Sequence, residues 1–243
     1  MAQITSQQNP RLKALRRLQT KRERARSGRF LAEGEDLLAA AERAGRPAVE
    51  GYRVAGSGLG GAGFHEVEQP ALAAVSTLGS GARVIGVYEQ RWGAPAGPLC
   101  VYLHGVSDPG NVGAVLRSAQ AFGASCVALG PGCADPHSPK AVRASMGAIF
   151  AVALARVGDP SELPGERVAL LAGAAEVLRG TGATDAPAIT LLVGAERNGL
   201  PLDVVAACER TARIPIASES LNAAMAATVA LYEMTRRPSR VTA

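Results

Sequence analysis

The apolar positions in the first third of the chain recur mostly at helical spacing. Leu12, Leu15 and Leu18 lie on one stripe, which predicts a helix over residues 11–26 that starts at Asn9-Pro10. The other elements expected before residue 90 are helices over 35–44 and 70–77 and strands over 52–55 and 83–88. Together they predict a small α/β module.

Beyond residue 98 the pattern changes to short apolar runs separated by helical stretches. The runs predict strands over 99–106, 125–129, 167–172, 188–194 and 211–216, and the stretches predict helices over 112–122, 140–149, 202–208 and 223–237. Strands that alternate with helices are typical of a parallel sheet covered on both faces. Prolines and glycines interrupt both patterns over 91–98, so we expect a linker there between domains 1–90 and 99–243.

The composition indicates a hydrophobic core and a small excess of basic over acidic residues. Hydrophobic residues make up 47% of the 243 residues and aromatic residues only 4%, so Ala, Val and Leu must fill the core. The formal net charge is +5, and within residues 11–29 every charged residue except Glu23 is basic. Such a segment fits a polyanionic partner, or it is simply a solvated basic face.

The four cysteines form no CxxC pair and have no disulfide-like spacing. We expect free thiols, with Cys100 and Cys126 buried in strands, and no metal site. The N-terminus lacks a charged-then-apolar secretory pattern, and no apolar run approaches membrane-spanning length. The sequence therefore predicts a soluble, cytoplasmic protein.

Residues 58–63 match the GxGxxG dinucleotide fingerprint letter by letter. The fingerprint needs a preceding strand, an immediately following helix and an acid about twenty residues further on. Here Phe64-His65-Glu66-Val67 follows, which is a poor helix opening. We therefore interpret 58–63 as a flexible loop, and a nicotinamide-dependent oxidoreductase as the weaker alternative for the function.

Three motifs beyond residue 98 bring polar residues to the ends of strands. In the first, Asp108-Pro109-Gly110-Asn111 follows a strand and opens a helix that carries Arg117. Asn111 can cap this helix or meet a ligand. Arg117 can fork onto a phosphate, or it is an ordinary surface arginine.

The second motif, Gly194-x-Glu196-x-x-Gly199-Leu200, leaves a buried strand through a sharp turn. Gly194 permits close approach of a ligand. Glu196 stands at the carboxyl end of the strand, where ligands of α/β sheets bind; alternatively, it pairs with Arg197. The spacing from Gly194 to Ile214 allows one helix to lie between two adjacent strands.

The third motif runs from Ile214-Pro215 to Ser220-Leu221-Asn222 and opens the Ala-rich helix. Ser218 or Ser220 is the expected N-cap of that helix, which places Ser220 and Asn222 beside unpaired backbone N–H groups. A ligand can be held by such groups. An ordinary strand–loop–helix turn is the alternative.

In order and spacing, these motifs closely resemble motifs one to three of the SpoU/TrmH RNA ribose 2′-O-methyltransferases. Ser138-Pro139-Lys140 and Arg143-Ala-Ser145-x-Gly147 look like a further signature segment of that family. The resemblance is strong over 99–237. It is weaker near the N-terminus, where Asn9-Pro10-Arg11 and Phe30-Leu31-x-Glu33-Gly34 are similar to the family's appended substrate-binding domain.

The resemblance implies an α/β protein with a C-terminal knotted (trefoil) parallel-sheet methyltransferase domain and a small N-terminal α/β RNA-binding domain. It also implies S-adenosylmethionine as cofactor and a homodimer formed through the C-terminal domain, in which two subunits complete each site. The residues implied at the cofactor are Gly194, Ile214 and Leu221, largely through backbone groups, with Ala172 and Gly173 at the adenine side. Those implied around the reacting ribose and the methionine portion are Asn111, Arg117, Glu196, Ser220 and Asn222.

The implied activity is transfer of a methyl group from S-adenosylmethionine to a ribose 2′-hydroxyl of structured RNA, with ribosomal RNA favoured. A transfer RNA substrate, methylation of a base and a non-catalytic RNA-binding relative stay open. Because a guanidinium is almost always protonated, we interpret Arg117 as a phosphate clamp and Ser220 or Asn222 as the proton acceptor. RNA contacts are expected from the basic residues Arg11, Lys13, Arg16, Arg17, Lys21, Arg22 and Arg143.

Overall fold

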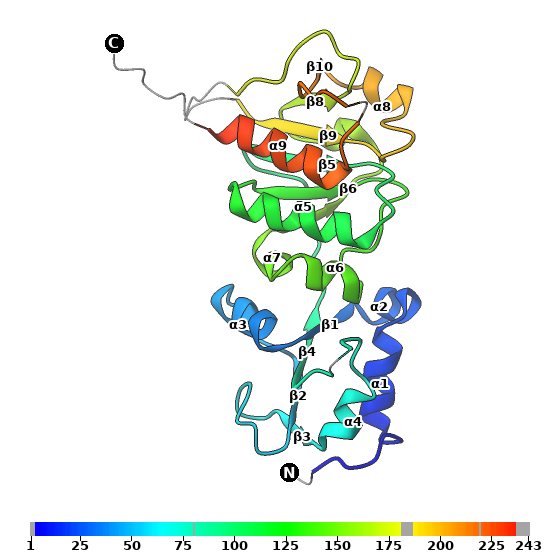
Figure 1. Cartoon of the computed structure of the whole chain (residues 1–243), viewed down its shortest axis with the longest axis vertical. Helices are drawn as coiled ribbons and strands as arrows, with labels where there is room; N and C mark the ends of the chain where they lie inside the picture. The colour runs from blue at the N-terminus through cyan, green and yellow to red at the C-terminus, as the bar shows by residue number, and fades with distance from the viewer. Residues whose placement is uncertain (1–2, 80, 181–186, 219, 237–243) are drawn as a thin grey trace, which may run out of the picture. The chain divides into compact units, whose positions relative to one another are not determined.

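The computed structural model describes residues 3–79, 81–180, 187–218 and 220–236. Contacts divide the chain into two compact units (Figure 1). The first unit comprises Met1–Arg91 and Asp135–Ala151, and the second comprises Trp92–Ala134 and Val152–Ala243. The expected division of the sequence at 91–98 stays a prediction about domains; by contacts, the segment Asp135–Ala151 groups with the first unit.

The first unit is built on a mixed four-stranded sheet in the order β1-β4-β2-β3. β4 (Val84–Glu89) runs antiparallel to β1 (Arg29–Glu33) and β2 (Glu50–Val54), and β3 (His65–Val67) runs parallel to β2. Its helices are α1 (Pro10–Leu18), α2 (Lys21–Ser27), α3 (Glu35–Arg43), α4 (Gln69–Ala73), α6 (Pro139–Ala144) and α7 (Ala148–Ala151). The unit mixes helices and strands as the pattern predicts, but β1 and β3 escaped prediction.

The helix predicted over 11–26 is two helices. The chain breaks at Thr20. The hydroxyl of Thr20 accepts a hydrogen bond from the N–H of Glu23 at 3.3 Å and so caps α2. The buried side chain of Arg24 donates to the carbonyl oxygens of Leu18 and Gln19 at 2.9 and 2.7 Å, which satisfies the end of α1. The prediction of one continuous helix was therefore wrong. The leucine stripe of α1 is buried as expected.

The helix predicted over 140–149 is also two helices, α6 and α7. Met146 and Gly147 interrupt it with φ of 49° and 94°. A β-carbon on Gly147 would lie 2.4 Å from the β-carbon of Ala40 in α3. The prediction was wrong because packing against α3 fixes a left-handed turn that local helix preference does not reveal.

Two kinds of contact hold the segment Asp135–Ala151 to the rest of the first unit. The Nε of Arg24 donates to Oδ2 of Asp135 at 2.8 Å, and both side chains are largely shielded from solvent. The ring of Phe150 lies 5.8 Å from the ring of Phe30 and 4.7 Å from that of Tyr88, centroid to centroid. Residues from both parts of the sequence therefore share one aromatic cluster.

The second unit is built on a parallel six-stranded sheet in the order β10-β8-β9-β5-β6-β7. The strands are β5 (Leu99–Leu103), β6 (Cys126–Leu129), β7 (Ala153–Arg156), β8 (Glu166–Leu170), β9 (Ile189–Val193) and β10 (Arg210–Ala212). The helices are α5 (Pro109–Ala121), α8 (Leu202–Ala206) and α9 (Ala223–Thr235), with a 3-10 turn at Pro160–Glu162.

This sheet confirms the predicted parallel arrangement. α5 and α9 lie side by side (Figure 1), and Val204 of α8 packs in a buried cluster with Cys100 and Tyr102. Successive residues of β5 point to opposite faces and are buried from Cys100 to Leu103, so both faces of this strand are covered. Cys100 and Cys126 are buried free thiols, as expected.

Three predictions for the second unit were wrong. β7 was missed, and the strand predicted over 211–216 covers only Arg210–Ala212, beyond which Arg213 forms an isolated bridge with Val177. The strands that end near Gly194 and Ile214 are not adjacent, since β8 lies between β9 and β10. Local spacing cannot show which strand inserts between two others.

The remaining connections agree with their interpretation as loops. Residues 58–63 form no helix, and the next element is the strand β3, so the dinucleotide fingerprint has no structural support. Within residues 90–98 no helix or strand occurs, although Gly93 forms a bridge with Ala155 at the edge of β7. In the part of the chain that is described, no helix has both the length and the apolar character needed to cross a membrane.

Candidate active site

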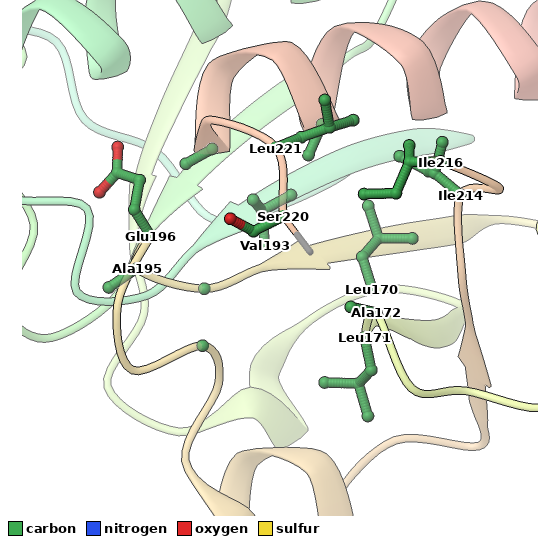
Figure 2. Close-up of a pocket in the computed structure, with 14 residues that line it drawn as sticks. Leu170, Leu171, Ala172, Val193, Ala195, Glu196, Ile214, Ile216, Ser220 and Leu221 are labelled. Carbon is green, nitrogen blue, oxygen red and sulfur yellow. The ribbon is translucent and has the colours of Figure 1, made fainter. Parts of the chain in front are cut away.

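A pocket opens where β8 and β9 end and α9 begins (Figure 2). It encloses about 700 Å³, including the part open to solvent. Its walls come from the end of β8, the turn after β9, the segment after β10 and the first turn of α9. Ligands of α/β sheets bind at the carboxyl ends of strands, so this position favours a binding site.

Most of the residues expected at a cofactor line this pocket. Ala172, Gly194, Ile214 and Leu221 belong to its wall, whereas Gly173 does not. The four lining residues follow different strands or precede α9, and the parallel sheet brings them to one edge. Within the described ranges, no group of three His, Cys, Asp or Glu side chains is arranged to hold a metal ion.

Two glycines shape the turn after β9. A β-carbon on Gly194 would lie 2.2 Å from the carbonyl carbon of Gly199, because the turn folds back on itself. The N–H of Gly199 closes this turn by donating to the oxygen of Ala195 at 2.9 Å, and Gly199 has φ of 62°, which favours glycine. The turn carries Glu196 to the pocket wall.

Three polar side chains from separate elements form a hydrogen-bonded network at the pocket edge. The amide Nδ2 of Asn111, in the first turn of α5, donates to Oε1 of Glu196. The Nδ2 of Asn222 donates to Oδ1 of Asn111 at 3.1 Å and, at 3.5 Å, to the same Oε1 of Glu196. The second carboxylate oxygen of Glu196 makes no hydrogen bond with the described residues, so it is open to a ligand.

Asn222 is the N-cap of α9, which corrects the expectation of Ser218 or Ser220 in that role. Its Oδ1 accepts hydrogen bonds from the N–H groups of Ala224 and Met225 at 2.9 and 3.3 Å. The cap falls here because α9 begins at Ala223, directly after Asn222, whereas Ser218 lies five residues before that start. The same amide thus ends the loop and holds the network.

Asp108 caps α5 and leaves Asn111 free for the network. Its Oδ1 accepts from the N–H groups of Gly110 and Asn111 at 2.6 and 3.1 Å. Asn111 therefore does not cap the helix, which was one of its two expected roles. Sequence reasoning missed Asp108, although an aspartate directly before a proline is a recognisable helix start.

Other site residues lie outside the network. Arg117 is exposed on α5 and makes no hydrogen bond or ion pair with any described residue. Ser220 is exposed and lines the pocket. Glu196 does not pair with Arg197 in the described part of the chain, so the alternative of an isolated loop ion pair is not realised.

The basic residues expected to bind RNA divide into two groups. Lys13, Arg17, Lys21 and Arg22 are exposed and have no side-chain partner among the described residues. Three others are engaged: Arg11 pairs with Glu50 at 2.6 Å, Arg16 donates to the oxygen of Gln7 at 3.0 Å, and Arg143 donates to the hydroxyl of Thr77 at 2.5 Å. The second group has less donor capacity left for a phosphate.

Comparison with known proteins identifies the class to which this fold and site belong. Residues 98–232 match the model of the SpoU rRNA Methylase family, and residues 9–86 match the MRM3-like substrate binding domain. The chain belongs to the SpoU rRNA methylase family. The resemblance seen in the sequence motifs is thereby confirmed.

Individual relatives extend the match to most of the chain. The 23S rRNA (guanosine(2553)-2′-O)-methyltransferase RlmP of Bacillus subtilis is 28% identical over 96% of this chain and 99% of its own. A crystal structure of an AdoMet-bound rRNA methyltransferase from Sinorhizobium meliloti is 31% identical, covers 96% of this chain and 97% of its own, and superposes with a TM-score of 0.83. An uncharacterized tRNA/rRNA methyltransferase of Mycobacterium tuberculosis is 38% identical over 55% of this chain; the match spans 50% of that relative's length.

Proposed function

We propose that this protein transfers a methyl group from S-adenosylmethionine to a ribose 2′-hydroxyl of structured RNA, with ribosomal RNA as the substrate. The observation that carries the proposal is the pocket at the ends of β8 and β9, with the Asn111–Glu196–Asn222 network at its edge. The Bacillus subtilis relative, named a 23S rRNA 2′-O-methyltransferase and matched over nearly its whole length, favours ribosomal over transfer RNA.

The lining of the pocket fits this cofactor. Leu170, Ile214 and Leu221 offer aliphatic surface to an adenosine, and the missing side chain of Gly194 brings backbone close to the pocket. Figure 2 shows Glu196 on the side of the pocket away from Leu170 and Ile214, with Ser220 between them, so a charged methionine portion finds polar groups there. When bound, the cofactor supplies an electrophilic methyl group on a positively charged sulfur.

The carboxylate of Glu196 is the group we assign to accept the proton of the ribose hydroxyl. A ribose hydroxyl is a weak acid, so its attack needs alignment and a proton acceptor. The Oδ1 of Asn222 is committed to two backbone N–H groups of α9, which makes it a poor acceptor. A hydroxyl such as that of Ser220 can relay a proton only to a base, and Glu196, which lines the same pocket, has one carboxylate oxygen open.

Arg117 is assigned as the phosphate clamp that orients the ribose. A guanidinium stays protonated and offers a fork of donors that matches a phosphate. The side chain is exposed and unpaired among the described residues, so these donors are available. It therefore aligns the hydroxyl and takes no proton.

We also infer a trefoil knot in the C-terminal domain. After β8 the chain passes Val177, which bridges to Arg213 beyond the end of β10. Further on, a β-carbon on Gly180 would lie 2.2 Å from the carbonyl oxygen of Glu233 in the last turn of α9. Residues 177–180 thus pass beside Arg213, just beyond β10, and beside the last turn of α9, a course that supports threading of the C-terminal segment through the β8–β9 connection.

We further infer that the protein is a homodimer formed through the C-terminal domain. Met225, Val229 and Tyr232 are exposed at helical spacing on one side of α9, with 61%, 40% and 56% of their surface accessible. A row of exposed apolar side chains is typical of an interaction face.

An N-terminal RNA-binding role is supported by the substrate-binding module matched over residues 9–86.

The proposal is tested by incubating the protein and labelled S-adenosylmethionine with total RNA from a strain that lacks the gene. We expect label in ribosomal RNA, and alkaline hydrolysis should be blocked at one nucleotide, because 2′-O-methylation prevents cleavage there. Label in transfer RNA, or on a base without a block, would redirect the proposal to those substrates. Calorimetry that detects no cofactor binding would indicate a non-catalytic relative.

A Glu196→Gln variant tests the assigned proton acceptor. We expect a loss of about 10²- to 10⁴-fold in turnover, the usual contribution of a general base. Cofactor binding should stay near the wild-type value, since glutamine can still accept hydrogen bonds from Asn111 and Asn222. Turnover within a few-fold of the wild type would exclude Glu196 as the acceptor.

A further inference from the structure

The interruption between α1 and α2 creates a hollow that a continuous helix would not have. Its lining consists of Arg17 from α1, Thr20 from the break, and Arg22, Glu23 and Arg26 from α2. On a straight helix, side chains three and four positions apart form a row along one side and enclose no hollow. Because the chain breaks at Thr20, side chains from α1 and α2 line a common space instead.

The side chains that line the hollow carry a net positive charge, which is available to bind an anion. Arg26 donates to both carboxylate oxygens of Glu23, at 3.1 and 2.5 Å. The lining thus holds three guanidinium groups and one carboxylate. The pKa of the Glu23 carboxyl is lowered first by the hydrogen bonds from Arg26 and also by the charges of Arg17 and Arg22. Neither Arg17 nor Arg22 makes a side-chain hydrogen bond or ion pair with a described residue.

Hydrogen bonds of the buried Arg24 and of Thr20 hold the ends of α1 and α2 that form the hollow. Arg24 is only 3% exposed and joins the end of α1 to Asp135 through its three hydrogen bonds. The hydroxyl of Thr20 donates to the oxygen of Arg17 at 2.8 Å while it caps α2. A site whose frame is fixed before binding loses less conformational entropy when a ligand arrives.

We propose that this hollow binds the phosphodiester backbone of the RNA substrate through Arg17 and Arg22. The inference rests on the proposed function, because it names where that RNA contacts the first unit. Arg17 and Arg22 stand on separate helices, which suits a ligand with regularly repeated anions, and each planar guanidinium fork can bind two oxygens of a phosphate. The hollow also lies within residues 9–86, which match a substrate-binding module.

If the hollow binds phosphate, loss of Arg17 and Arg22 should weaken RNA binding more than loss of two other exposed arginines of the first unit. The test compares the double variant Arg17→Gln/Arg22→Gln with the matched control Arg43→Gln/Arg91→Gln, which removes the same charge from exposed positions of the same unit. The probe is 23S ribosomal RNA from a strain that lacks the gene, and binding is measured across a series of KCl concentrations. Each lost phosphate contact lowers the slope of log K against log salt by about 1.

We expect the double variant to bind RNA roughly tenfold or more weakly at low salt, with a slope smaller by about 2, and the control to behave as the wild type. Equal slopes for the double variant and the control would overturn the hollow as a phosphate site while methylation by the wild type continues. A wild-type protein that neither binds nor methylates RNA would instead overturn the proposed function. Unchanged cofactor binding and melting temperature verify the fold, and Arg22→Glu serves as a second variant should the double variant fail to fold.

Discussion

At the scale of single residues, Asn222 joins helix structure to site geometry. Its amide oxygen caps α9, and its amide nitrogen holds Asn111 and Glu196. Replacement by Ala removes both functions, whereas Ser preserves a capping oxygen and removes only the amide donor. The two substitutions therefore separate stability from positioning.

We predict that Asn222→Ala lowers the free energy of unfolding by about 1 kcal/mol, or about 2–4 °C in melting temperature. Asn222→Ser should melt close to the wild type and still lose roughly tenfold or more in kcat, because a donor to a charged network contributes about 1.5–3 kcal/mol. Calorimetric melting and steady-state kinetics measure the two effects. A Ser variant with full kcat would show that Asn222 only caps the helix.

Arg117 gives a second prediction at this scale. If it clamps a phosphate by its charge, Arg117→Lys should keep near-normal turnover and raise KM for RNA by about tenfold, since the bidentate fork is lost and the charge remains. Initial-rate kinetics with varied RNA decide between binding and catalysis. A Lys variant that binds RNA normally and does not turn over would contradict the clamp.

The sequence predicted the role of a residue where a motif identifies it, but not where the role depends on the path of the backbone. Asn111, Glu196 and Asn222 stand far apart in sequence, and only the family resemblance brought them to one site; the structure joins them by hydrogen bonds. The caps were misassigned because Ser218, Ser220 and Asn222 all have suitable side chains. Which one caps depends on where the backbone turns into α9.

At the scale of elements, the short edge strand β10 is held by ion pairs as well as by its pairing with β8. Arg210 joins Glu166 and Glu176 at 3.0 and 2.6 Å, and Arg167 of β8 is hydrogen-bonded to Glu209. Hydrogen bonds from Arg167 lower the pKa of Glu209 to about 2. Stability at this edge should therefore depend on pH.

The sign follows from the direction of that pKa shift. The pKa of Glu209 is lower in the folded protein than its ordinary value of 4.5, so its contribution is present above about pH 4.5 and is lost as the pH falls toward 2. We predict that Glu209→Gln is less stable than the wild type at pH 7, by at most about 1 kcal/mol for so exposed a pair, and that the difference vanishes near pH 2. Urea unfolding at several pH values measures it, with Glu42→Gln as an exposed control. A difference independent of pH would contradict the ion-pair explanation.

Elements were predictable from the sequence where their pattern is local and strong. The runs that became β5, β6 and β9 are nearly continuous and apolar because these strands are buried on both faces. In β8 only Val168 and Ala169 are buried, and the strand starts with the partly exposed Glu166 and Arg167. The break at Thr20 was missed because it is stabilised by the buried Arg24, which is paired with the distant Asp135. The break at Met146-Gly147 was missed because it depends on packing against Ala40. Tertiary contacts override helix preference at both places.

At the scale of the whole molecule, the proposed dimer makes the activity depend on assembly. We predict that Met225→Glu/Val229→Glu converts a dimer into a monomer and abolishes methyl transfer, because charges on the apolar face of α9 cannot be buried without a partner. Light scattering after size exclusion measures the mass. Val49→Glu, at an exposed apolar position of the first unit, is the matched control. A wild-type protein that is active as a monomer would contradict the inferred dimer.

The return of the chain to the first unit limits how this protein can be divided. A fragment ending at residue 91 would keep Arg24 and Phe30 and lose Asp135 and Phe150, leaving a charge without its counterion and an aromatic cluster open to water. We therefore expect residues 1–91 alone to be less stable than the complete first unit. An exchange of substrate-binding modules between relatives, in evolution or in the laboratory, would have to carry the returning segment Asp135–Ala151 with it.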